Sequence, residues 1–282
     1  MTTPTTRNTP YVHGYSARET RRLTDQADTL AALLHDGTGY PPGSRILEAG
    51  CGVGAQTAHL AAAGPGAHIV AIDIDEESLA AAEQRLSGRP PAPGRQPASI
   101  EWQHADLREL PYPDAEFDHV FVCFVLEHLT RPDLALAGLR RVLRPGGTLT
   151  VIEGDHGSAF FHPAGRHADA VIAHQVRLQA AAGGDALIGR RLAPLLAAAG
   201  FTDVEARPRT VYADRTRPAL VDGFTRQTFI AMIASVRDEA VAAGLCGEAE
   251  FDRGLRELDR TATGEGTFHY TFVKATAVNP LP

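Results

Sequence analysis

The sequence predicts an α/β protein: a doubly wound, Rossmann-like sheet that is mostly parallel, with an antiparallel last strand and a helical lid. Two observations predict this fold. Short apolar segments alternate with helical patterns over the first 155 residues, as in parallel sheets that carry helices on both faces. A glycine-rich stretch, Gly50-Cys51-Gly52-Val53-Gly54, directly follows the first apolar segment, at the strand-to-helix turn where such sheets bind nucleotides.

The elements follow from these patterns in order. Ser16 and Glu19 have the spacing of a capping box. Four apolar residues at helical spacing then predict an amphipathic helix packed on the core: Leu23, Ala27, Leu30 and Leu34. Strands are expected at 45–49, 68–74, 99–104, 118–124 and 148–153, and helices at 56–63, at 76–86 behind an Asp75 cap, and around 134–142.

After residue 154 the alternation loosens. A helix is expected to end at Gly200, a strand to lie near 204–212, and a last strand to span 267–276. The mostly helical stretch between these two strands, about 217–263, is too long for a plain connection. It is expected to form a cap over a site or a surface for a homodimer.

Composition excludes several classes. The 282 residues carry a net charge of −7, which argues against nucleic acid, because phosphate binding needs a basic footprint. No apolar run reaches the ~18–20 residues that span a bilayer, and no signal-peptide pattern opens the chain, so no membrane partner is expected. Three scattered cysteines predict reduced thiols in a cytoplasmic protein. No histidine spacing matches a metal site, and none is predicted.

The glycine loop and the end of the second strand together predict a nucleoside ligand. Glycines let bare peptide N–H groups approach a ligand closely. Asp73, at the end of the second strand, can accept hydrogen bonds from both hydroxyls of a ribose. Gly50-x-Gly52-x-x-Ala55 also fits the dinucleotide fingerprint, so an NAD(P)-dependent oxidoreductase is the rival interpretation. Against it, Glu48 precedes the glycines, where its carboxylate would repel a pyrophosphate. A second acidic tip, Ala105-Asp106, and the stretch 144–149 also disfavour it.

Five motifs in order resemble the class I S-adenosylmethionine-dependent methyltransferases: "ILEAGCGVG", "IDID", "HADLRELPYPDAEFDHV", "FVCFVLEHL" and "LRRVLRPGGTLTVIEGD". The most similar group includes ubiquinone/menaquinone-biosynthesis C-methyltransferases and many natural-product methyltransferases of secondary metabolism. The resemblance covers residues 43–155. It implies an enzyme that uses S-adenosyl-L-methionine and releases S-adenosyl-L-homocysteine. A non-methylating protein that only binds this cofactor is a second rival.

The resemblance also implies a role for each motif residue. The backbone at Gly50, Cys51 and Gly52 should wrap the methionine part, and Glu48 should shape its amino end. The ribose should lie at Asp73. The remaining contacts implied are Ile74 and Leu107 on the two faces of the adenine, Asp106 beside Ala105 at its amine, Cys123 and Phe124 at the sulfonium, and Tyr11 or Tyr15 at the carboxylate or the acceptor.

Catalytic residues are weakly specified, because methyl transfer chiefly needs alignment of the acceptor with the methyl group. The first candidate is His156, as a base or an orienting group in a loop after the fifth strand, and the second is His128 beside Glu127. A partly hydrophobic small-molecule acceptor is expected, methylated on O, N or C. Its candidate contacts are Phe160, Phe161, Tyr212, Phe229, Met232 and Tyr270. The expected organisation is an N-terminal segment 1–40 that closes over the cofactor, a cofactor-binding core 41–155, and a remainder 156–282 containing the lid.

Overall fold

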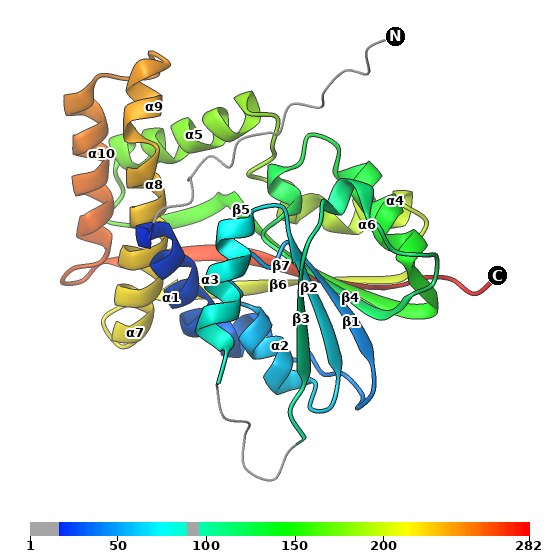
Figure 1. Cartoon of the computed structure of the whole chain (residues 1–282). Helices are drawn as coiled ribbons and strands as arrows, with labels where there is room; N and C mark the ends of the chain where they lie inside the picture. Colours follow the sequence, from blue (N-terminus) through cyan, green and yellow to red (C-terminus); the bar gives the residue numbers. More distant parts are fainter. Residues whose placement is uncertain (1–16, 89–95) are drawn as a thin grey trace.

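The computed structural model describes residues 17–88 and 96–282. The predicted Ser16 cap, Tyr11 and Tyr15 lie outside these residues. The fold centres on a seven-stranded sheet in the order β3-β2-β1-β4-β5-β7-β6, seen nearly edge-on in Figure 1. The strands are β1 (Arg45–Ala49), β2 (His68–Asp73), β3 (Ser99–His104), β4 (Phe117–Cys123), β5 (Leu143–His162), β6 (Thr202–Ala213) and β7 (Thr267–Val278).

The doubly wound prediction is confirmed. β1 pairs in parallel with β2 and β4, β2 with β3, and β4 with β5. Adjacent residues of β1 enter opposite layers of core: Ile46 packs with residues of α1 and α2, and Leu47 with residues of α4 and α6. Both side chains are completely buried, as expected for a strand covered on two faces.

Of the helices around this sheet, those expected at 56–63, 76–86 and 134–142 begin close to their predicted positions, one ends near Gly200 as predicted, and the one at 166–181 was not predicted. The helices are α1 (Ala17–Leu34), α2 (Thr57–Ala63), α3 (Glu76–Leu86), α4 (Pro132–Val142), α5 (Arg166–Ala181) and α6 (Leu192–Ala198), with short 3-10 turns at η1 (Leu107–Glu109), η2 (Leu126–His128) and η3 (Ile188–Arg191). The carboxylate of Asp75 accepts the Ser78 N–H at 2.8 Å, which confirms the predicted cap of α3.

The end of β5 differs from the prediction. Residues 154–162 were expected to form a loop, but β5 continues through them because β7 supplies an antiparallel partner. Asp155 pairs with Thr271, and after a register shift Phe160 pairs with His269. β6 also pairs antiparallel with β7, so β7 runs against both neighbours, as predicted for the last strand.

The stretch between β6 and β7 is helical, as predicted. It contains α7 (Pro218–Leu220), a π-helix η4 (Val221–Ile230), α8 (Ala231–Ser235), α9 (Arg237–Ala242) and α10 (Glu248–Thr261). In Figure 1, α8, α9 and α10 gather with α5 at the left-hand end of the molecule. η4 packs directly on α1, since a Cβ at Gly223 would overlap the Thr29 side chain. No helix in the described part of the chain is long and apolar enough to cross a membrane.

Candidate active site

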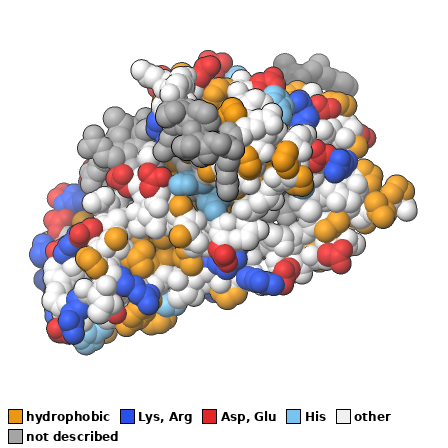
Figure 2. All heavy atoms as spheres, turned by 90° about the horizontal axis from the view of Figure 1, so that it is seen from below, with side chains coloured by type: hydrophobic (Ala, Val, Ile, Leu, Met, Phe, Trp, Pro, Cys, Tyr) orange, Lys and Arg blue, Asp and Glu red, His pale blue; other side chains and the backbone are white. Residues whose placement is uncertain are grey.

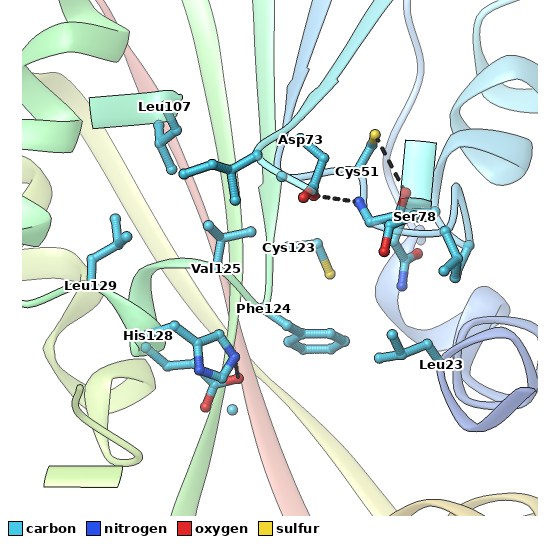
Figure 3. A pocket seen from close by; sticks show the side chains of 18 of the residues that line it. Leu23, Cys51, Asp73, Ser78, Leu107, Cys123, Phe124, Val125, His128 and Leu129 are labelled. Carbon is cyan, nitrogen blue, oxygen red and sulfur yellow. Dashed lines mark hydrogen bonds and ion pairs between the residues drawn. The ribbon is translucent and has the colours of Figure 1, made fainter. Parts of the chain in front are cut away.

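A cavity of about 640 Å³ lies at the carboxyl ends of the parallel strands. Its walls come from the loops after β1, β2, β3 and β4, from β5 and β7, and from α1 and η4. The loops that carry the sequence motifs therefore form one side of the cavity, and the lid forms the other. Figure 3 shows the region around the tips of β2 and β4.

The glycine loop wraps the tip of β2. The N–H groups of Gly50 and Cys51 both donate to the Ile72 carbonyl at 2.9 Å. Gly50 has φ +79°, and a Cβ there would lie 2.5 Å from a methyl carbon of Val125. Only glycine therefore fits this turn without displacing the loop after β4. Gly52 also has positive φ, but a Cβ there would meet nothing within 4 Å, because this residue faces the open cavity.

Asp73, the predicted ribose contact, lies at the end of β2 and lines the cavity. Its carboxylate accepts the Gly52 N–H at 2.7 Å through Oδ2 and the Asp75 N–H at 3.0 Å through Oδ1. Burial raises the pKa of this carboxyl, and the two amide bonds act in the opposite direction. Because the carboxylate is anchored by backbone and lines the cavity, it is a fixed acceptor for ligand hydroxyls.

The predicted adenine contacts line the same cavity: Ile74, Ala105, Asp106 and Leu107. Arg108 binds the Asp106 carboxylate with Nε at 2.9 Å and Nη2 at 2.6 Å. Burial raises the pKa of Asp106, the bonds from Arg108 lower it, and the net change is downward. Asp106 is therefore a charged acceptor at the wall, held by its neighbour in sequence.

Glu48 does not line the cavity. Its side chain is buried behind the glycine loop, and burial raises its pKa to about 8. Its Oε2 has no hydrogen-bond partner within residues 17–88 and 96–282. The prediction that Glu48 shapes the amino end of the methionine part therefore needs correction. The Glu48 side chain points into the core of the sheet, so any effect on a ligand acts through the glycine loop or through space.

The other end of the cavity is aromatic. Phe124, which directly follows β4, has φ +60° and projects between Leu23 and His128 in Figure 3. Its ring lies 5.3 Å from that of Phe272. Phe229 and Met232, both predicted acceptor contacts, line the cavity with Phe224 and Tyr270. The predicted sulfonium neighbours Cys123 and Phe124 thus separate the glycine loop from an apolar chamber.

Three predicted acceptor contacts lie elsewhere. Phe160 is 60% exposed and stacks on His269 at 3.9 Å. Phe161 stacks on Phe268 instead of lining the cavity, and Tyr212 is exposed at the edge strand β6. All three belong to the extended β5–β7–β6 sheet, whose register carries them past the cavity.

Both candidate histidines line the cavity. The Nδ1 of His156 lies 2.5 Å from the Tyr270 hydroxyl, and burial lowers the pKa of this imidazole. His128 lies 3.7 Å from the Glu127 carboxylate, which also accepts the Gln179 amide at 3.2 Å. His156 is therefore a neutral group at ordinary pH, placed on a strand and not in the predicted loop.

Sequence reasoning missed several lining residues, among them Arg22 and Gln26. These two lie one turn apart on α1, and the Arg22 guanidinium donates to the Gln26 side chain at 3.1 Å. Both are buried. Their spacing on the same stripe as Leu23 is a signal that could have found them, because polar residues on the buried face of a helix indicate a site. Other lining residues that were missed include Val53, Ala55, Gln56, Ser78, Phe224 and Thr228.

Comparison with known proteins decides the type of domain. A sequence profile described as a methyltransferase domain matches residues 47–151, which contain the glycine loop, Asp73 and Asp106. The chain carries a class I S-adenosylmethionine-dependent methyltransferase domain. S-adenosylmethionine is the cofactor of this domain. The glycine loop therefore belongs to an S-adenosylmethionine-dependent domain and not to an NAD(P)-dependent oxidoreductase.

One curated relative matches most of this chain, and others match a region about as long as the methyltransferase domain. An uncharacterized 37.1 kDa protein in transposon TN4556 of Streptomyces fradiae is 32% identical over 237 residues, which are 83% of this chain and 63% of that protein. The demethylmenaquinone methyltransferase of Clavibacter sepedonicus is 39% identical over 111 residues, 39% of this chain and 41% of that enzyme. The matched regions thus span less than two thirds of the length of each of these relatives.

Solved structures share the methyltransferase fold. The [4+2]-cyclase SpnF has a TM-score of 0.53 at 24% identity, with 90% of this chain and 82% of that chain covered. A phosphoethanolamine N-methyltransferase 2 from Haemonchus contortus, in complex with S-adenosylmethionine, has a TM-score of 0.56 at 15% identity, with 95% and 61% covered. At these identities the likeness establishes the fold alone and nothing about the acceptor.

Proposed function

We propose that this chain transfers a methyl group from S-adenosyl-L-methionine to a partly hydrophobic small-molecule acceptor. One observation carries the proposal: the motif residues Gly52 and Asp73 and the aromatic chamber beyond Phe124 are walls of one continuous cavity. A cofactor held at Gly52 and Asp73 presents its sulfonium end toward the aromatic chamber. A concave, largely apolar chamber of this kind favours a metabolite over a polymer.

The chain's own residues divide the work by position. The glycine loop and Asp73 bind the methionine part and the ribose. Ile74, Asp106 and Leu107 bind the adenine. The rings of Phe124, Phe229 and Tyr270 exclude water and orient the acceptor. When bound, the cofactor supplies an activated methyl group on a good leaving group, so alignment contributes most of the rate, on the order of 7–11 kcal/mol.

His156 and His128 are the proposed groups that meet the reacting part of the acceptor. Both lie at the chamber: the Tyr270 hydroxyl is hydrogen-bonded to His156, and the Glu127 carboxylate lies 3.7 Å from His128. The surface agrees with a metabolite acceptor. Figure 2 shows acidic and basic side chains interspersed over one face, without the basic stripe that nucleic acid needs. A cytoplasmic location, a homodimer, a role in secondary metabolism and the division at residues 40 and 155 remain predictions.

The test is transfer of label. Purified protein is incubated with methyl-labelled S-adenosylmethionine and a small-molecule extract, with boiled protein and Asp73→Ala protein as controls. A labelled product formed only by the active protein supports the proposal. A protein that is stabilised against heat by S-adenosylhomocysteine but labels nothing across such extracts is a non-methylating binder, and the proposal is then wrong. Stabilisation by NAD(H) alone would reject the cofactor assignment as well.

A further inference from the structure

The contact between Tyr270 and His156 determines which nitrogen of the imidazole carries the proton. Tyr270, on β7, is 2% exposed, and its hydroxyl lies 2.5 Å from the His156 Nδ1 on β5. A Cβ at Gly154 would overlap this hydroxyl, so the strand carries glycine where the phenol arrives. The pair is therefore built into the sheet, with its partners on adjacent strands.

The proton of this bond belongs to the phenol. Burial raises the pKa of Tyr270 well above its ordinary value, so the hydroxyl keeps its hydrogen. Within the described residues, the one hydrogen-bond partner of that hydroxyl is the His156 Nδ1. A buried hydroxyl is rarely left without an acceptor, and an imidazole nitrogen is a better acceptor than a phenol oxygen. Nδ1 is therefore the unprotonated nitrogen.

A neutral imidazole with an unprotonated Nδ1 carries its hydrogen on Nε2. Burial lowers the pKa of His156, so the ring is neutral. No residue within 17–88 or 96–282 accepts a hydrogen bond from Nε2 in the structure, and His156 lines the cavity. The Phe229 ring lies edge-on to the imidazole, with ring centroids 6.3 Å apart, and the charged or polar groups that act on His156 are Glu127, His128, Asp155 and Arg22.

We propose that Tyr270 holds His156 in the Nε2–H tautomer, so that His156 donates a hydrogen bond to the methyl acceptor and does not remove its proton. This inference rests on the proposed function and deepens it. The acceptor it fits carries an oxygen that accepts a hydrogen bond beside the methylated atom, as a carbonyl, enolate or phenolate does. His156 is then an orienting group, Tyr270 is a positioning residue, and the hypothesis of His156 as a base is replaced.

The tautomer can be measured without an acceptor. Protein labelled with ¹⁵N-histidine is saturated with S-adenosylhomocysteine, and the ring nitrogens are observed by long-range ¹H–¹⁵N NMR, with His156 assigned by its loss in His156→Gln. The wild type is expected to show a single Nε2–H form, and Tyr270→Phe a mixture. Tyr40→Phe, a buried tyrosine away from the cavity, is the matched control and is expected to leave the signal unchanged. A wild-type proton on Nδ1, or a tautomer unaffected by Tyr270→Phe, would overturn the proposal.

Label transfer gives the second readout. Glutamine can donate from a side-chain amide but cannot take up a proton, whereas leucine can do neither. His156→Gln is expected to be at least about tenfold more active than His156→Leu, the loss expected for one hydrogen bond, with folding checked by circular dichroism. Equal loss of label transfer in the two variants would contradict the proposal and favour His156 as a general base. If the wild type labels nothing, the proposed function fails, while the NMR result still decides the tautomer.

Discussion

The Asp73 carboxylate accepts the Gly52 N–H at 2.7 Å, so the tip of β2 and the glycine loop are one unit. The aspartate does two things at once: it holds the loop and offers its oxygens to the cavity. Replacing it is therefore expected to change both the proposed contact with a ribose and the shape of the loop that is proposed to surround the methionine part.

Asp73→Ala is expected to weaken S-adenosylhomocysteine binding by roughly 1.5–3 kcal/mol, because hydrogen bonds to a charged group are lost. This corresponds to on the order of 10- to 150-fold in Kd by isothermal titration calorimetry. Asp75→Ala is the matched control. It removes the cap of α3 and lowers the melting temperature, but Asp75 does not line the cavity. Equal Kd values for wild type and Asp73→Ala would show that the ribose lies elsewhere.

Gly52→Ala is expected to abolish tight cofactor binding while the protein stays folded. Gly52 has φ +50°, and an added Cβ would contact no protein atom within 4 Å, so it would occupy cavity volume. Gly37 has φ +73° in open space and is remote from the cavity, so Gly37→Ala carries the same backbone strain, about 1 kcal/mol. Similar melting temperatures with a Kd at least about tenfold weaker for Gly52→Ala alone are expected. Equal Kd values in the two variants would place the ligand away from the loop.

The stability of the protein is expected to depend on pH through Glu48. Burial raises the pKa of Glu48 to about 8 from 4.5. The folded state therefore retains a proton that the unfolded state releases, and stability falls as pH rises between these values. Glu48→Gln removes this dependence. The variant should gain about 2–4 kcal/mol relative to wild type between pH 5 and pH 8, measured by urea unfolding, while exposed Glu77→Gln follows the wild type. Parallel curves for wild type and Glu48→Gln would mean that the carboxyl is hydrated.

The parallel half of the sheet could be predicted from the sequence because its signals are local. In β1 the apolar residues Ile46, Leu47 and Ala49 fill covered positions, with Glu48 as the buried exception, and the Asp73 tip follows from the end of a similar strand, β2. The lid chamber could not be predicted in the same way. Whether Phe160 or Tyr270 faces the cavity depends on the register of β5 against β7, which lie more than a hundred residues apart in sequence.

Glu48 shows a second kind of limit. The motif identifies the residue, but the direction of its side chain depends on which face of β1 it occupies. The resemblance implied a contact with the ligand, while the alternation along the strand buries the carboxyl in the sheet. Arg22 shows the opposite case, since an arginine on the apolar stripe of an amphipathic helix is a local signal in the sequence.

Phe229→Leu and Phe160→Leu together test which aromatic residues meet the acceptor. Phe229 is 2% exposed and lines the cavity, with its ring 5.5 Å from that of Tyr270. Phe160 is 60% exposed and lies outside. Reshaping an apolar pocket changes substrate selection by about 10- to 200-fold, so Phe229→Leu should reduce label transfer within this range and leave the Kd for S-adenosylhomocysteine close to that of wild type. Phe160→Leu should leave both quantities unchanged. A reversed order of effects would mean that the acceptor binds near the exposed Phe160 and outside the cavity.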